Sequence, residues 1–273
     1  MSNTVLVTGA SSGLGRATAK KFHGKGWNVV ATMRAPEQET ELQRLDHVLV
    51  TRLDVQDHES IEGAVGAALQ TFGRIDAVVN NAGYGVFGPL EATPIETIRR
   101  QFEVNVIGMI ATTKAVLPHY RANRRGVIVN VSSIGGRMAF PLGTAYHGSK
   151  FAVEGLSEAL HYELGALGVR VKVVEPGGMK TDFGGRSLDF NHDPTLVAYE
   201  PLVQSVHKVL GPLMENGSDP AAVAEVIYGA ATDGSDRLRY EAGADALEVL
   251  AARRGADDAA FMAGIRTQFG ISP

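Results

Sequence analysis

A tyrosine and a lysine four residues apart are the side chains whose spacing first suggests chemistry in this sequence. On a helix, Tyr146 and Lys150 lie on one face. A nearby ammonium favours the phenolate, which predicts a pKa for Tyr146 below the usual value of about 10. Such a phenol gives a proton to a carbonyl oxygen, or takes one from an alcohol, near neutral pH. The pair alone occurs by chance on many helices, but Ser133 ends the preceding predicted strand, where its hydroxyl could hydrogen-bond the same oxygen.

A glycine-rich turn near the N-terminus predicts a binding site for a diphosphate. Residues 8–15, TGASSGLG, follow the apolar run 5–7 and lead into a segment with helical spacing. Glycine lets the backbone turn sharply and approach a diphosphate, and the first turn of a helix offers unpaired N–H groups to an anion. Such a turn alone can merely close a βα unit. Its place after the first strand, followed by further matching pieces, favours a dinucleotide.

The elements that must position these residues alternate between strand-like and helix-like segments. Strands are predicted over residues 5–7, 28–32, 47–53, 77–80, 126–131, 170–175 and 237–240. Helices are predicted over residues 16–22, 61–72, 95–117 (with Pro118 near the end) and 144–167, with more helical segments toward the C-terminus. Short apolar strands between helices predict an α/β fold with a doubly wound parallel (Rossmann) sheet of about seven strands and helices on both faces. Residues 1–273 are predicted to form a single domain.

Polar or glycine-rich residues follow nearly every predicted strand. They are residues 8–15, 33–34, 54–55, 80–83, 132–133 and 176–181. A loop turn explains any one of these sets. Because parallel sheets of this kind bind ligands beyond the carboxyl ends of their strands, the sets together predict a binding crevice.

Composition and charge exclude several other classes of function. With 273 residues and 44% apolar content, the chain can bury one large core. The net charge of −4 comes without a basic run, which argues against nucleic acid or an anionic membrane surface as a partner. There is no cysteine, and His119, His147 and His161 show no metal-ligand spacing, so we expect no metal and interpret them as ordinary surface or helix residues. Without a signal-peptide pattern or an apolar run of about 18 residues, a cytoplasmic protein without membrane contact is expected.

Together these motifs resemble the short-chain dehydrogenase/reductase family of the single-domain type, over at least residues 4–181. The resemblance rests on the glycine-rich turn, on residues 80–83 (NNAG), on Asn105, on Ser133 with Tyr146-x-x-x-Lys150, and on residues 176–177 (PG). It implies an enzyme that transfers a hydride between a nicotinamide dinucleotide and a carbonyl or alcohol. The protein's share is then binding, orientation and proton handling.

The resemblance also implies roles for individual residues. Tyr146 would be the acid or base, Ser133 would position and polarise the substrate oxygen, and Lys150 would hold the nicotinamide ribose and tune Tyr146. Asn105 would hold a water that links Lys150 to solvent; alone, it reads as a helix residue that satisfies a backbone kink. The residues expected to contact the cofactor are Gly9, Ser11, Ser12, Gly13, Leu14, Gly15, Arg34, Asp54, Val55, Asn81, Ala82, Gly83, Tyr146, Lys150, Pro176, Gly177, Met179 and Thr181, with Asn80 in the same ribose and adenine wall.

Residues 183–217 do not belong to the predicted sheet and are expected to form a substrate lid. The segment opens with Gly184-Gly185, and its apolar side chains are Phe183, Leu188, Phe190, Leu196, Tyr199, Leu202, Val203, Val206 and Val209. Four apolar residues beyond strand ends could line the same cavity: Val86, Phe87, Met138 and Phe140. We interpret the helical half (Leu202, Val206, Val209) as core. An apolar lid predicts a hydrophobic ketone or secondary alcohol, with similarity toward the hydroxysteroid- and retinol-dehydrogenase-like branch.

The end of the second predicted strand indicates NADP(H) as the cofactor. Family members that prefer NAD usually place an aspartate where Met33 lies, whereas here Arg34 follows. A guanidinium beside the ribose could pair with a 2′-phosphate through charge-assisted hydrogen bonds of about 1.5–3 kcal/mol each. The alternative is a solvent-facing arginine, and with it an NAD-dependent alcohol dehydrogenase of the same family.

Two functions of other classes also remain as alternatives. A dinucleotide-binding sensor without turnover is disfavoured by the presence of Ser133, Tyr146 and Lys150. A sugar-nucleotide epimerase or dehydratase usually has a larger C-terminal domain than the stretch after Pro176 supplies. Because the family commonly packs the helices holding Asn105 and Tyr146 against a partner, a homodimer or homotetramer is expected.

Overall fold

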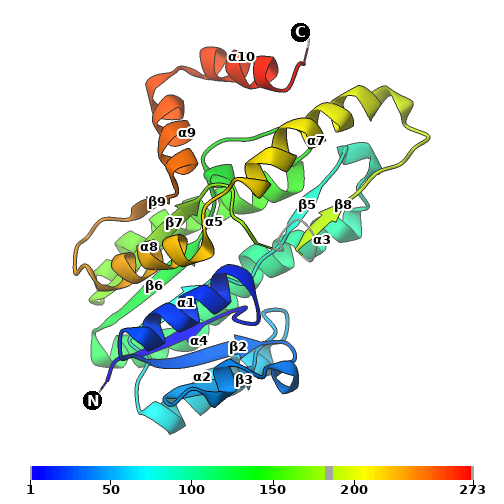
Figure 1. Ribbon diagram of the computed structural model, residues 1–273. Helices are drawn as coiled ribbons and strands as arrows, with labels where there is room; N and C mark the ends of the chain where they lie inside the picture. Colours follow the sequence, from blue (N-terminus) through cyan, green and yellow to red (C-terminus); the bar gives the residue numbers. More distant parts are fainter. Residues whose placement is uncertain (1, 182–186, 272–273) are drawn as a thin grey trace.

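The computed structural model describes residues 2–181 and 187–271, and a sheet of seven parallel strands lies at the centre of this part of the chain (Figure 1). The strand order is β3-β2-β1-β4-β6-β7-β9. The strands are β1 (Thr4–Val7), β2 (Asn28–Met33), β3 (Val48–Arg52), β4 (Ala77–Asn80), β6 (Gly126–Val131), β7 (Val169–Pro176) and β9 (Arg239–Ala242). Val7 lies opposite both Ala31 and Val79, so the central strands end at one edge. The predicted doubly wound α/β fold is confirmed.

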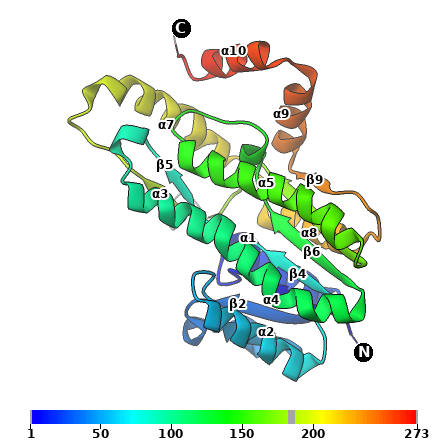
Figure 2. The same cartoon turned by 180° about the vertical axis from the view of Figure 1, so that it is seen from behind.

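Helices cover both faces of the sheet, as Figures 1 and 2 show from opposite sides. Along β1, Val5 and Val7 pack with α1 and α8, whereas Leu6 packs with α2, α4 and α5. Because both faces are buried, the strands are nearly continuous apolar runs. The helices are α1 (Gly13–Gly24), α2 (His58–Phe72), α3 (Ile95–Phe102), α4 (Gly108–Asn123), α5 (Thr144–Gly165), α7 (Glu200–Glu215), α8 (Pro220–Thr232), α9 (Ala244–Gly255) and α10 (Asp258–Gln268).

The helix predicted over residues 95–117 differs in two ways from what the structure shows. A π-helical turn, Glu103–Ile107, separates α3 from α4, and Pro118 lies inside α4 and does not end it. The last turn of α4 is held by Tyr120, which is fully buried and donates its hydroxyl to the carbonyl oxygen of Val127 at 3.4 Å. Burial of this ring outweighs the one backbone hydrogen bond that a proline removes.

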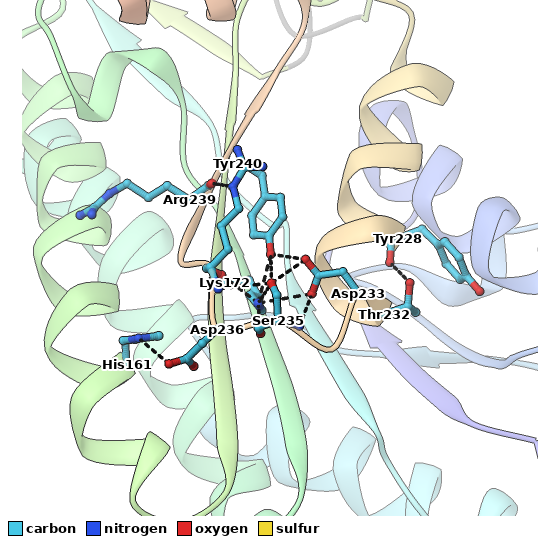
Figure 3. Close-up of polar contacts among 10 residues, drawn as sticks. His161, Lys172, Tyr228, Thr232, Asp233, Ser235, Asp236, Arg239 and Tyr240 are labelled. Carbon is cyan, nitrogen blue, oxygen red and sulfur yellow. Dashed lines mark hydrogen bonds and ion pairs between the residues drawn. The ribbon is translucent and has the colours of Figure 1, made fainter. Parts of the chain in front are cut away.

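The seventh strand begins at Arg239, two residues later than predicted, because the backbone carbonyl groups just before it hydrogen-bond a buried lysine. Lys172 on β7 is 1% exposed, so its ammonium must be satisfied inside the protein. It donates to the carbonyl oxygens of Ser235 (2.6 Å) and Arg237 (2.8 Å), as Figure 3 shows for this network. The carbonyl of Arg237 is therefore committed to Lys172, and the ladder with β7 starts at Arg239.

A second, two-stranded sheet was not predicted. Its strands are β5 (Gly85–Phe87) and β8 (Leu188–Phe190), which run parallel. The buried side chain of Gln101 fixes β5, since its Oε1 accepts from the Val86 N–H at 2.6 Å and its Nε2 donates to the Tyr84 carbonyl at 2.7 Å. Phe183 and the pair Gly184-Gly185 of the predicted lid lie outside the described residues.

The chain ends in α9 and α10, which stand out from the sheet beyond β9 in both views (Figures 1 and 2). Among the residues that the structure describes, no helix is long and apolar enough to cross a membrane.

Candidate active site

The carboxyl ends of the central strands open into one cavity of about 1220 Å³. We call residues 8–15, 80–83, 132–133 and 176–181 at these ends the rim. Apart from Asn80, the residues expected to contact the cofactor line this cavity: Gly9, Ser11, Ser12, Gly13, Leu14, Gly15, Arg34, Asp54, Val55, Asn81, Ala82, Gly83, Tyr146, Lys150, Pro176, Gly177, Met179 and Thr181. Ser133 lines it as well, so the parallel sheet brings residues from distant parts of the chain to one place.

The glycine-rich turn has the geometry that a diphosphate requires. Gly9 (φ +68°) and Gly13 (φ +50°) have left-handed backbone conformations, which favour glycine. At Gly15 a Cβ atom would lie 2.1 Å from the carbonyl oxygen of Gly9, so no other residue fits without displacing the turn. Ser12 begins α1 without capping it through its side chain, which leaves the first N–H groups of the helix to an anion. These features fit a dinucleotide.

Asn81 acts on the protein as well as lining the cavity. Its side-chain amide donates to the carbonyl oxygens of Thr8 (2.9 Å) and Gly9 (3.3 Å). The hydroxyl of Thr8 accepts from the backbone N–H groups of Asn81 and Ala82, each at 3.0 Å. The loop after β4 therefore braces the glycine-rich turn.

Two arginines near the glycine-rich turn and the end of β2 differ in their surroundings. Arg16 is committed to the protein, because it forms ion pairs with Glu39 (2.5 Å) and Glu41 (2.8 Å). Arg34 is exposed and lines the cavity, beside the buried Met33. Unlike Arg16, Arg34 has its guanidinium available to a ligand at this end of the cavity.

Tyr146, Ser133 and Lys150 meet at the centre of the cavity. Ser133 is buried at the end of β6, where its Oγ accepts from the Gly135 N–H at 3.0 Å and hydrogen-bonds Tyr146. Lys150 lies one helical turn after Tyr146 and donates from Nζ to the carbonyl oxygen of Val131 at 3.0 Å. Strand β6 thus holds Ser133 and Lys150 together, and α5 supplies the phenol.

The expected shift of the Tyr146 pKa is reversed in the structure. Burial raises the pKa of this phenol above its usual value, and the hydrogen bond with Ser133 lowers it only in part. Burial also lowers the pKa of Lys150 to about 8, partly offset by the charge of Glu154. The Lys150 ammonium lies 5.9 Å from the centre of the Tyr146 ring.

Asn105 and Asn80 lie behind the cavity and do not line it. Asn105 is buried in the π-helical turn, where its Nδ2 donates to the Tyr84 carbonyl at 2.9 Å and to Ser149 Oγ at 3.1 Å. Asn80 was expected in the cofactor wall, but its amide donates to Thr113 (3.1 Å) and to Asn130 (2.8 Å). Both amides hold elements together; the water-holding role of Asn105 stays a prediction.

His147 is not the ordinary helix or surface residue that the sequence suggested. It is 4% exposed, and its ring joins the carbonyl oxygen of Gly135 to the N–H of Phe140, each at 2.9 Å. Burial lowers the pKa of the imidazole, so Nδ1 donates to Gly135 and Nε2 accepts from Phe140. This ring fastens the loop after Ser133 to α5; its position beside Tyr146 was the available signal.

Asp245 is a second residue that the sequence did not reveal. It lies in the first turn of α9, lines the cavity, and accepts at Oδ2 from the Gly178 N–H at 2.7 Å. A Cβ atom on Gly177 would lie 2.1 Å from the same oxygen, so the carboxylate fills the space beside these glycines. The C-terminal helices are therefore tied to the loop that carries Met179 and Thr181.

A buried charge network supports β7 directly below the rim. Glu175, 1% exposed, pairs with Arg137 at 3.0 Å and with Arg239 at 3.7 Å. Arg239 also pairs with the buried Glu154 at 2.9 Å. Burial and the nearby charge of Glu154 raise the pKa of Glu175 to about 7, against the effect of both arginines.

The other side of the cavity is mostly apolar. Of the residues predicted to line it, the structure places these six there: Phe87, Met138, Phe140, Leu188, Phe190 and Val206. Val86 is buried in the small sheet, while Leu202 and Val209 pack around Phe269 as core, as interpreted from the sequence, together with Val203. Val206 belongs to that core too. Helices α9 and α10 and the turn between them contribute residues that the sequence did not single out, among them Val249, Ala256, Ala260 and Phe261.

Comparison with known proteins places this arrangement among related chains. A family model described as short chain dehydrogenase matches residues 3–191. An uncharacterized oxidoreductase of Schizosaccharomyces pombe is 45% identical over 239 residues, covering 88% of this chain and 100% of the relative. The crystal structure of a short-chain dehydrogenase from Streptomyces avermitilis has a TM-score of 0.82 and 34% identity, covering 99% of this chain and 98% of the other.

Other similar proteins have named substrates or cofactors. 3-Ketodihydrosphingosine reductase of Bacteroides thetaiotaomicron is 41% identical over 179 residues, covering 66% of this chain and 65% of that protein. NADPH-dependent 3-dehydrocapnine reductase of Ornithobacterium rhinotracheale is 31% identical, covering 86% of both. The structure of ElxO with NADP bound has a TM-score of 0.72 and 27% identity, covering 88% of this chain and 98% of the other.

Proposed function

The chain belongs to the short-chain dehydrogenase family, and on that premise we propose that it transfers a hydride between NADP(H) and a hydrophobic ketone or secondary alcohol. An NAD(P)-dependent oxidoreductase is what the family establishes. The observation that carries the proposal is that Ser133, Tyr146 and Lys150 line the same cavity as the glycine-rich turn. A sensor without turnover would not need this constellation.

Each of the three central side chains has one task in the proposed reaction. Tyr146 gives its proton to the carbonyl oxygen in reduction and takes it back from the alcohol in oxidation. Ser133, already hydrogen-bonded to that phenol, polarises the same oxygen. Lys150, which is positioned by its hydrogen bond to the Val131 carbonyl oxygen, binds the ribose hydroxyls. When bound, the nicotinamide supplies or accepts the hydride at carbon.

The proposed preference for NADP(H) rests on the end of β2. Met33 offers no carboxylate to repel a 2′-phosphate, and Arg34 lines the cavity next to it. Relatives support both dinucleotides: ElxO has been solved with NADP, and 3-ketoacyl-(acyl-carrier-protein) reductase from Brucella melitensis with NADH (TM-score 0.73, 26% identity, covering 88% and 96%). The name of the Ornithobacterium rhinotracheale reductase states NADPH.

The proposed substrate class rests on the apolar wall opposite the glycine-rich turn. Phe87, Met138 and Phe190 line it, and the ring of Phe87 lies 5.2 Å from that of Tyr146. Such an apolar wall favours a hydrophobic substrate over a sugar nucleotide. The Bacteroides thetaiotaomicron relative, named for a ketone of a long-chain base, supports a hydrophobic ketone. We also propose that residues 187–217, of which Leu188 and Phe190 line the cavity, act as the substrate lid.

The test is a kinetic comparison of both dinucleotides across ketones, alcohols, steroids and sugar nucleotides. We expect a higher kcat/KM with NADPH, by about tenfold to hundredfold, since one charge-assisted contact contributes about 1.5–3 kcal/mol. The double variant Met33→Asp plus Arg34→Leu should reverse the order. A wild-type enzyme that works better with NADH would overturn the cofactor assignment, and turnover of sugar nucleotides alone would overturn the substrate class.

We propose in addition that the chain self-associates through α4 and α5 and their flanking turn. Ile107 of the turn and Phe151 and Tyr162 of α5 are 45%, 48% and 72% exposed, and large exposed apolar side chains favour a protein partner. Light scattering coupled to gel filtration measures the mass directly. A monomer at every concentration tested would contradict the proposal.

A further inference from the structure

Helices α9 and α10, with the residues that follow them, form an arch that is fastened at its two ends. We call residues 244–271 the arch. At its start, Ala246 and Leu250 are buried against Ile134 and Met138, next to Ser133. At its end, Phe269 is fully buried in the cluster around α7, and Ser205 donates its hydroxyl to the Phe269 carbonyl. Figure 1 shows the two helices turning back toward α7.

The middle of the arch covers the cavity and touches the core only through two partly buried side chains, Phe261 and Ile265. None of the α10 residues is buried, yet five residues of α10 line the same cavity as Tyr146: Ala260, Phe261, Gly264, Ile265 and Gln268. Opposite them, α7 lines it with Val206, Leu210 and Met214, which are spaced four residues apart and so share one helix face. Eight helical residues extend about 12 Å, so this part of the cavity is elongated.

The charge and size of the lining side chains restrict what the space under the arch accepts. Among the described residues of α7, α9 and α10, no lysine or arginine lines the cavity. The carboxylate of Asp245 is already bound by the Gly178 N–H. An anionic carrier such as a nucleotide or a phosphorylated group meets no lysine or arginine there and faces the carboxylate of Glu215, whereas hydrocarbon gains by leaving water.

We propose that the arch binds the tail of the substrate, so that the enzyme takes ketones and secondary alcohols with a long unbranched alkyl chain. This inference rests on the proposed function and narrows its substrate class. The substrate's alkyl chain would start at the carbon whose oxygen is held by Ser133 and Tyr146, and it would extend between α7 and α10. Ala256, Ala260 and Gly264 leave room on the arch side, and the α7 side chains form the opposite wall.

Filling the roof tests the inference, because α10 is accessible enough to accept a larger side chain. Ala260→Leu places an isobutyl group in the cavity, and Ala263→Leu, an exposed position of the same helix that does not line the cavity, is the matched control. The substrates are butanone, tetradecan-2-one and a rigid steroid ketone. We expect Ala260→Leu to lower kcat/KM for tetradecan-2-one by about tenfold or more, the effect of misfit by a few methylene groups, with butanone and the control nearly unchanged.

A binding measurement separates this inference from the proposed function. Calorimetric titration of tetradecan-2-ol into the enzyme with reduced dinucleotide measures binding in the space under the arch without turnover. Binding that Ala260→Leu abolishes supports the arch even if no ketone is reduced, in which case the proposed function alone fails. Turnover without a preference for the long chain, a preference for the steroid, or equal losses in both leucine variants would overturn the inference. Absence of both binding and turnover would overturn both.

Discussion

At the rim of the sheet, a side chain on Gly15 would collide with the carbonyl of Gly9, whereas on the arch Ala260 is exposed and borders the cavity. Both regions enclose the same cavity. The rim is held by buried hydrogen bonds, such as those of Asn81 to Thr8 and Gly9. The arch is fastened at its ends, with α10 unburied between them. In a site built in this way, the catalytic and dinucleotide-binding residues are held in fixed positions. Selection of the substrate by shape then falls to the arch, where larger side chains can be accommodated.

The difference follows from what each region must do. Proton transfer and dinucleotide binding require atoms in defined positions, and interactions with that precision need buried, hydrogen-bonded supports. Contact with a hydrocarbon requires only apolar surface of about the right size, because the hydrophobic effect is not directional. Substitutions at the rim should therefore lower activity toward every substrate alike, and substitutions in the arch should lower activity toward some substrates more than others, according to their size.

The largest effect is expected from Tyr146→Phe, which keeps the ring and removes the proton. Turnover should fall by about 10²–10⁴-fold for every substrate, while dinucleotide affinity changes little. Tyr84→Phe is the matched control: Tyr84 also lines the cavity, and among the described residues its buried hydroxyl has no hydrogen-bond partner. Steady-state and single-turnover kinetics measure both. If Tyr146→Phe kept more than about a tenth of the turnover with chemistry rate-limiting, Tyr146 would not be the acid.

Gly15→Ala is expected to have a smaller effect, which is a loss of stability and of dinucleotide affinity. The added methyl would lie within 2.1 Å of the Gly9 carbonyl and 2.6 Å of the Asn81 amide, so the glycine-rich turn must shift. Overpacking of this kind costs about 1–3 kcal/mol, and dinucleotide affinity should fall with it. Gly63→Ala in α2, where a Cβ meets nothing within 4 Å, should instead stabilise by about 0.5–1 kcal/mol. Chemical denaturation and dinucleotide titration report both; equal behaviour of the two variants would remove the steric argument.

The contrast between the two regions also explains what could be predicted from the sequence. The rim residues carry local patterns, a glycine-rich turn and polar residues after strands, because backbone geometry permits few alternatives there. The residues predicted from these patterns line the cavity, except Asn80, whose amide is bound inside the protein. Asp245 carries no local pattern, since its partner Gly178 is distant in sequence. The arch reads only as amphipathic helix, and nothing local indicates that it folds back over the cavity. The predicted direction of the Tyr146 pKa shift was wrong because burial, a tertiary effect, outweighs the effect of the nearby charge.

Below the rim, Glu175 predicts a pH dependence of stability. Its pKa rises from 4.5 to about 7 on folding, so the fold favours the protonated acid. That stabilisation is complete below pH 4.5 and is lost as the pH rises through 7, by at most about 1.4 kcal/mol per pH unit. Relative to wild type, Glu175→Gln should therefore become progressively more stable across this window.

Glu158, an exposed partner of Arg239, provides the control with the opposite sign. The hydrogen bond from Arg239 lowers its pKa, so its contribution is lost as the pH falls through the folded-state value. Urea denaturation of wild type, Glu175→Gln and Glu158→Gln at several pH values gives the differences. A Glu175→Gln variant whose stability follows that of wild type over the whole window would show that the carboxylate is ionised throughout.

The smallest effect is expected where the lid meets the rim, at Leu188 and Phe190 on β8. Phe190 is the register partner of Phe87, whose ring lies against Tyr146, so β8 links the apolar wall to the phenol. Replacing Leu188 and Phe190 with serine should raise KM severalfold for bulky hydrophobic ketones and less for small ones, with kcat unchanged, because only uniform binding is lost. A fall in kcat for all ketones would instead mean that Phe190 positions Tyr146 through Phe87, and the boundary between the fixed rim and the adaptable roof would then lie beyond the small sheet.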